Sequence, residues 1–241
     1  MAKTHNLPTP AQIADLKEGL ADCDKGIYAK TLQEFKLRAK QGNVDAQFSL
    51  GAMYDIGQGV AQNDRVALKW YRLAAKQGDA NAQFKLGAMY ATGQGVAQDY
   101  QAALKWFLLA AEQGVAGAQF SLGAMYANGE VVAQDYQTAL KWYRLAAKQR
   151  DAGAQCNLGA MYATGEGVAQ DYQEALKWLR LAAKQGYAHA QFSLGAMYAN
   201  GQGVAQDDKA ALNWFRLAAE QGFAEAQADI DAMYAEGRVA D

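Results

Sequence analysis

The sequence predicts an all-α fold of tandem helix–turn–helix repeats, and three observations carry this prediction. Five tryptophans recur every 36 residues, and they are Trp70, Trp106, Trp142, Trp178 and Trp214. The methionines after the first keep the same spacing, from Met53 to Met233. Within each unit, apolar residues recur at i, i+4, i+7 and i+8, which is one face of a helix. Such a fixed period is the signature of a repeat architecture.

Composition and charge exclude several classes of protein. The 241 residues carry 23 basic and 25 acidic side chains, with a net charge of −2 and a pI near 5.8. This balance lacks the excess of Lys and Arg that phosphates or anionic lipids require, so we expect no nucleic-acid binding and no membrane-surface binding. Two cysteines cannot form a disulfide framework.

The chain also lacks the signals of membrane insertion and secretion. It contains no uninterrupted apolar run of about 18 residues, so we expect no membrane insertion. The segment Met1–Pro10 has no apolar run of the secretory type. The sequence leaves the compartment open: we expect a soluble protein, cytoplasmic as the chain stands and periplasmic or secreted if a leader was removed.

Residues 151–186 show how each complete repeat is expected to fold. Ala154, Leu158 and Met161 form one stripe of a first helix, which ends at Gly165 because glycine adopts the left-handed cap conformation without strain. Asp171 can cap a second helix by accepting bonds from its first backbone N–H groups. Six residues give that helix its expected buried face: Leu176, Leu179, Ala183, Ala175, Trp178 and Ala182. Since one hairpin cannot cover its own apolar faces, the units must stack.

The repeats divide the chain into three predicted parts. Residues 1–42 are expected to form N-terminal capping helices of a degenerate opening repeat, residues 43–222 five complete repeats of 36 residues, and residues 223–241 a C-terminal half repeat acting as a cap. Thr9 to Gln12 carries a cap residue, a proline and a glutamine in the order that begins a helix, which we expect to run to about Cys23. The repeats are expected to end near Asp241.

The repeated pattern A-x-A-Q-x-x-L-G-x-M-Y-x-x-G-x-G-V-x-Q-D closely resembles that of the Sel-1-like repeat family, relatives of tetratricopeptide repeats, over residues 27–241. The resemblance implies an all-α, right-handed superhelical solenoid, used mainly for adaptor and scaffold roles in bacterial and eukaryotic proteins, and it implies no reaction. Family members often carry proline before the Gln-Asp pair. This chain has alanine there: Ala61, Ala97, Ala133, Ala169 and Ala205.

Positions that are identical in the five complete units are interpreted as core. The tryptophans belong to this set, and so do the glycines inside the first helices, Gly87, Gly123, Gly159 and Gly195. A helical glycine costs up to about 1 kcal/mol against alanine, and close helix approach would compensate for it. An invariant glutamine in each first helix should bond to the backbone of a neighbouring unit. The alternative is a ladder of amides that faces a bound peptide. These residues are Gln47, Gln83, Gln119, Gln155 and Gln191.

The variable positions predict where a partner would bind. In a tetratricopeptide-type unit the first helix lines the concave wall, and its exposed positions should be the third, seventh, tenth and fourteenth. We call this surface the first-helix stripe. Its candidate binding residues are Asp45, Ser49, Asn81, Lys85, Thr92, Ser121, Asn128, Asn157, Thr164, His189, Ser193 and Asn200. The stripe is small, polar and nearly uncharged. On the second helix, Lys141, Arg144 and Lys148 should form a solvated outer face.

No catalytic or metal-binding pattern is present in the sequence. His5 and His189 lack acidic or cysteine neighbours at metal-ligand spacing. Cys23 and Cys156 are interpreted as buried small hydrophobic residues. The motifs S-x-x-K, G-x-S-x-G and H-E-x-x-H do not occur. The G-x-G pairs follow helices, so they predict turns rather than phosphate loops. We expect no metal and no cofactor.

The leading hypothesis is a non-enzymatic scaffold or adaptor that binds a peptide or protein segment in its concave groove. One alternative is a structural or self-assembling repeat protein without a dedicated ligand, which would also suit an idealised or recently duplicated sequence. A cell-wall or β-lactam-acting enzyme is a further alternative, because some secreted relatives with a cysteine pair in each unit have been discussed in those terms. The oligomeric state stays open, with a monomer favoured.

Overall fold

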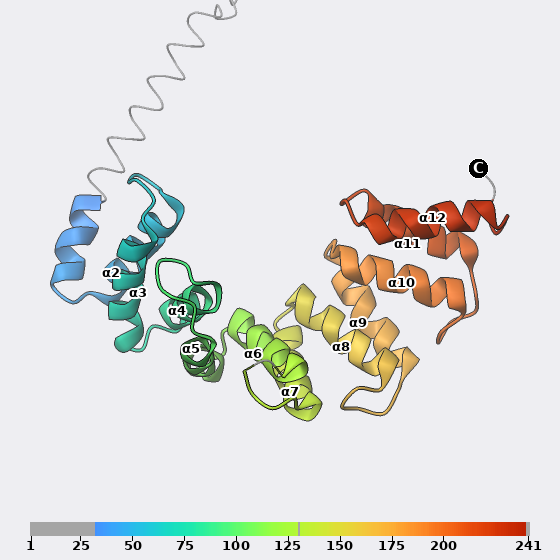
Figure 1. Ribbon diagram of the computed structural model, residues 1–241, viewed down its shortest axis with the longest axis horizontal. Helices are drawn as coiled ribbons and strands as arrows, with labels where there is room; N and C mark the ends of the chain where they lie inside the picture. Colours follow the sequence, from blue (N-terminus) through green and yellow to red (C-terminus); the bar gives the residue numbers. More distant parts are fainter. Residues whose placement is uncertain (1–31, 130, 240–241) are drawn as a thin grey trace, which may run out of the picture. The chain divides into compact units, whose positions relative to one another are not determined.

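A computed structural model describes residues 32–129 and 131–239, and within these ranges it shows helices and short connections and no strand (Figure 1). Residues 32–40 are helical. The helices that follow are α2 (Val44–Ile56), α3 (Asp64–Lys76), α4 (Ala80–Thr92), α5 (Tyr100–Glu112), α6 (Ala116–Asn128), α7 (Tyr136–Lys148), α8 (Ala152–Thr164), α9 (Tyr172–Lys184), α10 (Ala188–Asn200), α11 (Asp208–Ala219) and α12 (Ala224–Ala235). This confirms the predicted all-α repeat fold. The helix expected between Thr9 and Cys23 lies outside the described residues.

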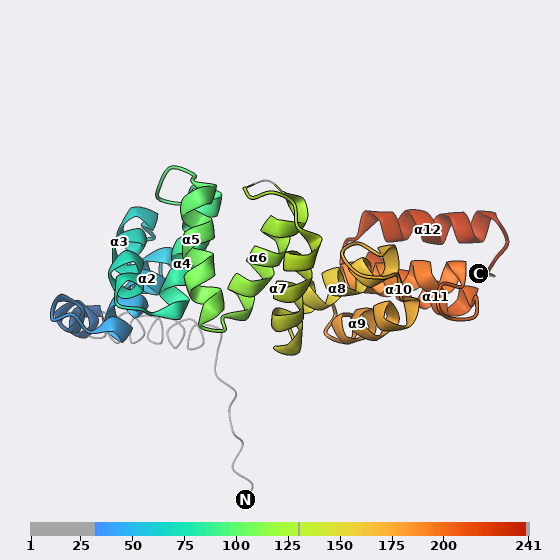
Figure 2. The same cartoon turned by 90° about the horizontal axis from the view of Figure 1, so that it is seen from below.

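The helices group into two compact units. One ends at Ala103 and the other begins at Leu104, so the boundary falls inside α5. Within the second unit, α8 packs against α9 of its own repeat and against α7 of the preceding repeat. α10 packs in the same way against α11 and α9, and α12 packs against α11 (Figure 2). α8 and α10 are therefore each held between two second helices, whereas α12 packs against one.

Capping residues end and begin the helices where the sequence predicts. Gly165 closes α8 with φ at 83°, and its N–H donates to the Met161 carbonyl. The Asp171 side chain accepts bonds from the N–H groups of Gln173 and Glu174 at 2.9 and 3.1 Å. Both caps satisfy backbone groups that a helix end leaves without partners. The G-x-G pairs have positive φ and form turns, as predicted.

A glycine on each first helix allows the two helices of a hairpin to touch. A Cβ placed on Gly123 would lie 2.5 Å from Cδ1 of Tyr143, and one on Gly159 would lie 2.7 Å from Cγ of Leu179. Such distances are too short for real carbon contacts. Gly51 and Gly195 face Tyr71 and Phe215 in the same way. The expected close approach is confirmed at these sites, and it offsets the poor helix propensity of glycine.

The tryptophans are less buried than the sequence predicted. All five are half-buried, whereas the residue after each tryptophan is buried. Four of these following residues face a glycine and are at most 3% exposed: Tyr71, Tyr143, Leu179 and Phe215. Trp178 of α9 instead packs against the core that α7 of the preceding repeat forms with α8 of its own repeat. The prediction was wrong because helical spacing alone does not separate two neighbouring positions at the edge of one apolar face.

The invariant glutamines join consecutive repeats through buried hydrogen bonds. Nε2 of Gln155 in α8 donates to the Ala147 carbonyl at the end of α7, at 3.1 Å. Its Oε1 accepts from Nε2 of Gln185 at the end of α9, at 2.8 Å. Gln47, Gln83, Gln119 and Gln191 donate to the equivalent alanine carbonyls. These amides are at most 5% exposed. The bond to a neighbouring unit is therefore confirmed, and a ladder of amides facing a bound peptide is wrong.

The glycine contact predicts a change of sign in a simple substitution. Helix propensity alone would make Gly123→Ala stabilising by up to about 1 kcal/mol. Because the new methyl group collides with the Tyr143 ring, we expect a loss of about 1–3 kcal/mol in the free energy of unfolding. Urea unfolding followed by circular dichroism measures it. Ala124→Gly at the adjacent half-buried position is the control and should cost only about 1 kcal/mol. A higher urea midpoint for Gly123→Ala would contradict the contact.

The glutamine network predicts a cost for removing one buried amide. Gln155→Leu leaves the Ala147 carbonyl and the Gln185 amide without their partner, so we expect the free energy of unfolding to fall by about 1–3 kcal/mol. Gln173→Ala is the control, because it removes only an exposed bond to the Gly203 carbonyl and should change stability by less than about 0.5 kcal/mol. Equal urea midpoints for the two variants would show that the buried amide does not join the repeats.

Candidate functional site

The twelve candidate residues of the first-helix stripe all lie on α2, α4, α6, α8 and α10, and none of them is buried. The third and fourteenth positions are the most accessible, as at Asp45, Thr164 and Asn200, which are exposed. The seventh position is half-buried in each repeat, as at Ser121 and Asn157. The stripe is therefore accessible in each of the five repeats. That it binds a partner stays a prediction.

In the first unit the stripe contains a charged cluster that the sequence reasoning missed. The carboxylate of Asp55 in α2 accepts bonds at 3.2 Å from Nζ of Lys85 in α4, from the Tyr71 hydroxyl and from Nε2 of Gln94. The Asp55 side chain is 13% exposed. A signal for it was present in the sequence, because the other repeats carry alanine at this position, for example Ala91 and Ala163. Lys85 is therefore held by an ion pair rather than free on the surface.

The tyrosine beneath this cluster has a shifted pKa. Burial raises the pKa of Tyr71 well above 10, and the nearby negative charge of Asp55 and its hydrogen bond raise it further. These causes all favour the neutral phenol, because the phenolate would be buried beside a carboxylate. Burial also raises the pKa of Tyr143, although the bond donated by Nδ2 of Asn157 to the Tyr143 hydroxyl at 3.0 Å acts in the opposite direction.

In the second unit the candidate side chains have partners of their own. The hydroxyl groups of Ser121 and Ser193 donate to the carbonyls four residues earlier, at 2.8 Å. The ring of His189 stacks on Tyr187, with centroids 5.4 Å apart, and meets the edge of Phe223 at 4.8 Å. A hydroxyl that donates in this way still has lone pairs to accept a bond. These serines can therefore accept from the backbone or side chains of a bound segment.

Between α10 and α12 the stripe forms a hollow of about 200 Å³. Its walls include Ala196 and Asn200 of the stripe, together with Asp229 of α12 and Glu236, which directly follows this helix. Phe215 and Met233, which are buried, also line it. Arg238 borders the hollow and bonds to Asp208, which lowers the pKa of that carboxyl. The stripe positions of neighbouring first helices thus meet around a depression, which the period of the sequence did not reveal.

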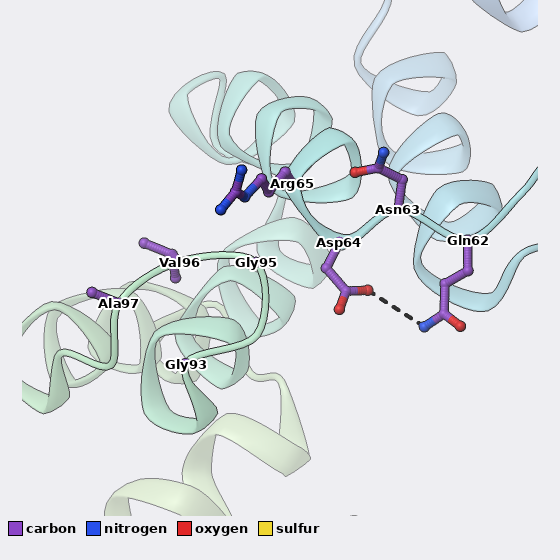
Figure 3. Close-up of a pocket in the computed structure, with 8 residues that line it drawn as sticks. All are labelled: Gln62, Asn63, Asp64, Arg65, Gly93, Gly95, Val96 and Ala97. Atoms are coloured by element: carbon purple, nitrogen blue, oxygen red, sulfur yellow. Dashed lines mark hydrogen bonds between the residues drawn. The ribbon is translucent and has the colours of Figure 1, made fainter.

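A second depression, between the loops before α3 and after α4, is explained by turn packing (Figure 3). Gly93, Gly95, Val96 and Ala97 line one side of it, and residues 62–65 line the other. The Asp64 carboxylate accepts from Gln62 at 3.4 Å and from Gln94 at 3.2 Å. A Cβ on Gly95 would lie 2.6 Å from the Asp64 carbonyl carbon, so the glycine is required for the fit of the loop. No candidate residue of the stripe lines this depression.

The described part of the chain offers little chemistry for a reaction or a metal. Among the described residues, no three His, Cys, Asp or Glu side chains lie close enough to hold a metal ion. Cys156 is 6% exposed, as predicted, and burial raises the pKa of its thiol to about 11. It is therefore a neutral thiol at physiological pH, whereas the thiolate is the nucleophile. No helix among the described residues is long and apolar enough to span a membrane.

Comparison with known proteins places the repeats in a defined group. The family model described as Sel1 repeat matches five consecutive segments, residues 44–79, 80–115, 116–151, 152–187 and 188–223. These segments begin one residue after the units predicted from the sequence. None of the curated proteins matches the chain.

Solved structures of similar proteins come from several bacteria. A Sel1 repeat protein from Oxalobacter formigenes is 38% identical, with 92% of this chain and 91% of that chain covered and a TM-score of 0.79. A protective antigen of uropathogenic Escherichia coli is 33% identical, with 92% of this chain covered and a TM-score of 0.78. The chain spans 50% of the length of that antigen. A putative Sel1 repeat protein from Klebsiella pneumoniae, at 23% identity, 84% and 99% coverage and a TM-score of 0.53, shares the fold.

The shifted pKa of Tyr71 predicts that stability falls at high pH. The folded state holds the phenol proton more tightly than the unfolded state, so this contribution is complete below pH 10 and is lost as the pH rises above it. The urea midpoint of the native chain should therefore fall more steeply between pH 9 and pH 11.5 than that of Tyr71→Phe. The variant should fold, because Phe107 and Phe215 occupy the same position in other repeats. Parallel pH profiles for the two proteins would contradict the burial of an un-ionised Tyr71.

Proposed function

Because this chain belongs to the Sel1 repeat family, we propose that it is a non-enzymatic scaffold that holds a peptide or protein segment along its first-helix stripe. Sel1 repeat proteins generally mediate protein–protein interaction. The partner segment would lie in the concave groove that the first helices line in this type of repeat. Its affinity would come from many modest contacts rather than from a few large anchors.

One observation carries the proposal: the positions that are identical in all five repeats are used for packing, whereas the positions of the first-helix stripe stay accessible. In α8, Gly159 packs against the other helix of its hairpin, Gln155 bonds to the preceding repeat and Leu158 is buried in the core. The twelve stripe residues are not buried, and they come from columns that vary between repeats: the seventh position, for example, is serine in three repeats, lysine in one and asparagine in one. A surface that varies on a constant scaffold is suited to recognition, because changes there leave the stacking intact.

A binding role fits the residues better than a reaction does. The best nucleophile in the described chain by residue type, Cys156, is a buried neutral thiol. The ring of His189 packs against the rings of Tyr187 and Phe223. Nucleophilic catalysis needs a nucleophile and a base within hydrogen-bonding distance of each other. We therefore assign no reaction to the stripe.

Photo-crosslinking from the stripe tests the proposal. A benzophenone side chain at the exposed Thr164 should form a discrete adduct with a protein of the source organism. The same group at Lys209, exposed on α11, is the control and should give no such adduct. Replacing Asn128 and Asn200 with arginine should reduce the yield of the Thr164 adduct at least about tenfold through steric block of the stripe, with unchanged helicity.

The opposite results would reject the stripe. Adducts of equal yield from both positions would mean that the contact is non-specific. Adducts only between copies of this chain would favour the self-assembling alternative, and no adduct under conditions that crosslink a known control complex would leave the stripe without a partner.

A further inference from the structure

A hollow of about 480 Å³ lies between neighbouring second helices, away from the first-helix stripe. It is bounded by the end of α7 and its following turn on one side and by the last two turns of α9 on the other. None of the twelve candidate residues lines it. Its lining residues are Ala147, Lys148, Arg150, Gln155, Trp178, Leu181, Lys184 and Gln185.

The hollow is positively charged and its cations have no acidic partner. Lys148, Arg150 and Lys184 are exposed, and no acidic side chain lines the hollow. Among the ion pairs within the described ranges, none includes any of these three side chains. The two lining glutamines are uncharged and bond to each other. Nearby Lys177 differs, because it pairs with Glu174 at 2.9 Å.

Arg150 occupies a backbone conformation that favours glycine. Its φ is +69°, and it is the only residue other than glycine with positive φ among the described residues. The equivalent residues of the other repeats are all glycine with φ between 83° and 94°, and they are Gly42, Gly78, Gly114, Gly186 and Gly222. A side chain is strained in this conformation. The strain at Arg150 is unnecessary for the turn, since glycine forms the same turn elsewhere, and it adds a guanidinium group to the hollow.

The equivalent positions on neighbouring repeats carry less positive charge. In two other repeats, the position equivalent to Lys184 is glutamate, Glu112 and Glu220. The position equivalent to Arg150 is glycine in the other repeats. Three cations therefore gather at one junction between repeats and do not continue along the chain. A nucleic-acid strand needs a continuous row of phosphate contacts, so this local charge favours a short acidic segment of protein.

Apolar surface adjoins the three cations. Trp178 is half-buried, and Leu181 is 41% exposed. A partner side chain that is apolar or aromatic could cover this surface while carboxylates beside it meet Lys148, Arg150 and Lys184.

We propose that this hollow is a second docking site, which binds an acidic peptide segment with carboxylates on both sides of an aromatic residue. Carboxylates pair with the three unpartnered cations, and arginine can hold one of them with two parallel hydrogen bonds. The aromatic ring packs on Trp178 and Leu181. The site is separate from the first-helix stripe, so a scaffold of this kind can hold two partners at once.

Fluorescence anisotropy with a labelled probe tests the proposal on the full chain. The probe is the peptide Gly-Ser-Glu-Glu-Phe-Glu-Glu-Ser-Gly, compared with a peptide that has glutamine for each glutamate and with a nine-nucleotide oligothymidine. We expect the acidic peptide to bind, with affinity that falls as salt rises, and both comparison probes to bind at least about tenfold more weakly.

Variants at Arg150 separate recognition from folding. Arg150→Gly should weaken peptide binding about fivefold or more and raise the urea midpoint, because it removes both the charge and the strain. Arg150→Lys should keep most of the binding, and Lys141→Gln, on α7 outside the hollow, is the matched control and should keep all of it. Leu181→Ala should weaken binding of the acidic peptide but should not change binding of a peptide in which alanine replaces the phenylalanine.

Three results would overturn the proposal. The first is equal peptide affinity for Arg150→Gly and the native chain. The second is equal affinity of the glutamate and glutamine peptides, which would remove the role of charge. The third is tighter binding of oligothymidine than of the acidic peptide, which would indicate a nucleic-acid site.

Discussion

The close contact between a first-helix glycine and the buried side chain that follows each tryptophan determines how the hairpins are built. At Gly123 and Tyr143 the two helices approach so closely that a methyl group does not fit between them. Because of this contact, the residue after the tryptophan is the one buried inside the hairpin. The tryptophan packs instead against the core between two repeats, as Trp178 does against the core of α7 and α8. The glycine contact within the hairpin thus also determines that the tryptophan is the side chain that packs at the junction between repeats.

The same packing separates positions that stabilise the fold from positions that can change. Buried glutamines and their alanine partners repeat with little variation because the hydrogen bond between them joins neighbouring repeats. Departures from the pattern occur where no such partner is required, and two of them produce local chemistry. Asp55 and Lys85 form an ion pair across α2 and α4, and Arg150 adds a cation to the hollow between α7 and α9. The repeat therefore works as a constant frame with individual surfaces.

Most of the fold could be predicted from the sequence because a 36-residue period fixes helices, caps and turns together. The caps at Gly165 and Asp171 and the bonds of the invariant glutamines were predicted correctly. The burial of the tryptophans was not predicted correctly. The tryptophan and the residue after it lie at the edge of the same apolar face, and only the packing of the partner helix determines which of the two is buried. The Asp55 cluster and the Arg150 hollow were missed because residues 30 or more positions apart meet there. Both sites could have been found by listing the residues that differ from the repeat pattern and asking which of them fall in neighbouring repeats.

The central claim is that each first helix has one face fixed by packing and one face open to a partner. Thiol labelling tests it most directly, with Cys156 on the packed face of α8 and Thr164→Cys on the open face, in a chain that carries Cys23→Ala. The account predicts that the cysteine at position 164 reacts at the rate of an unstructured peptide, while Cys156 reacts only as fast as the chain unfolds. Similar rates for the two thiols under native conditions would contradict it.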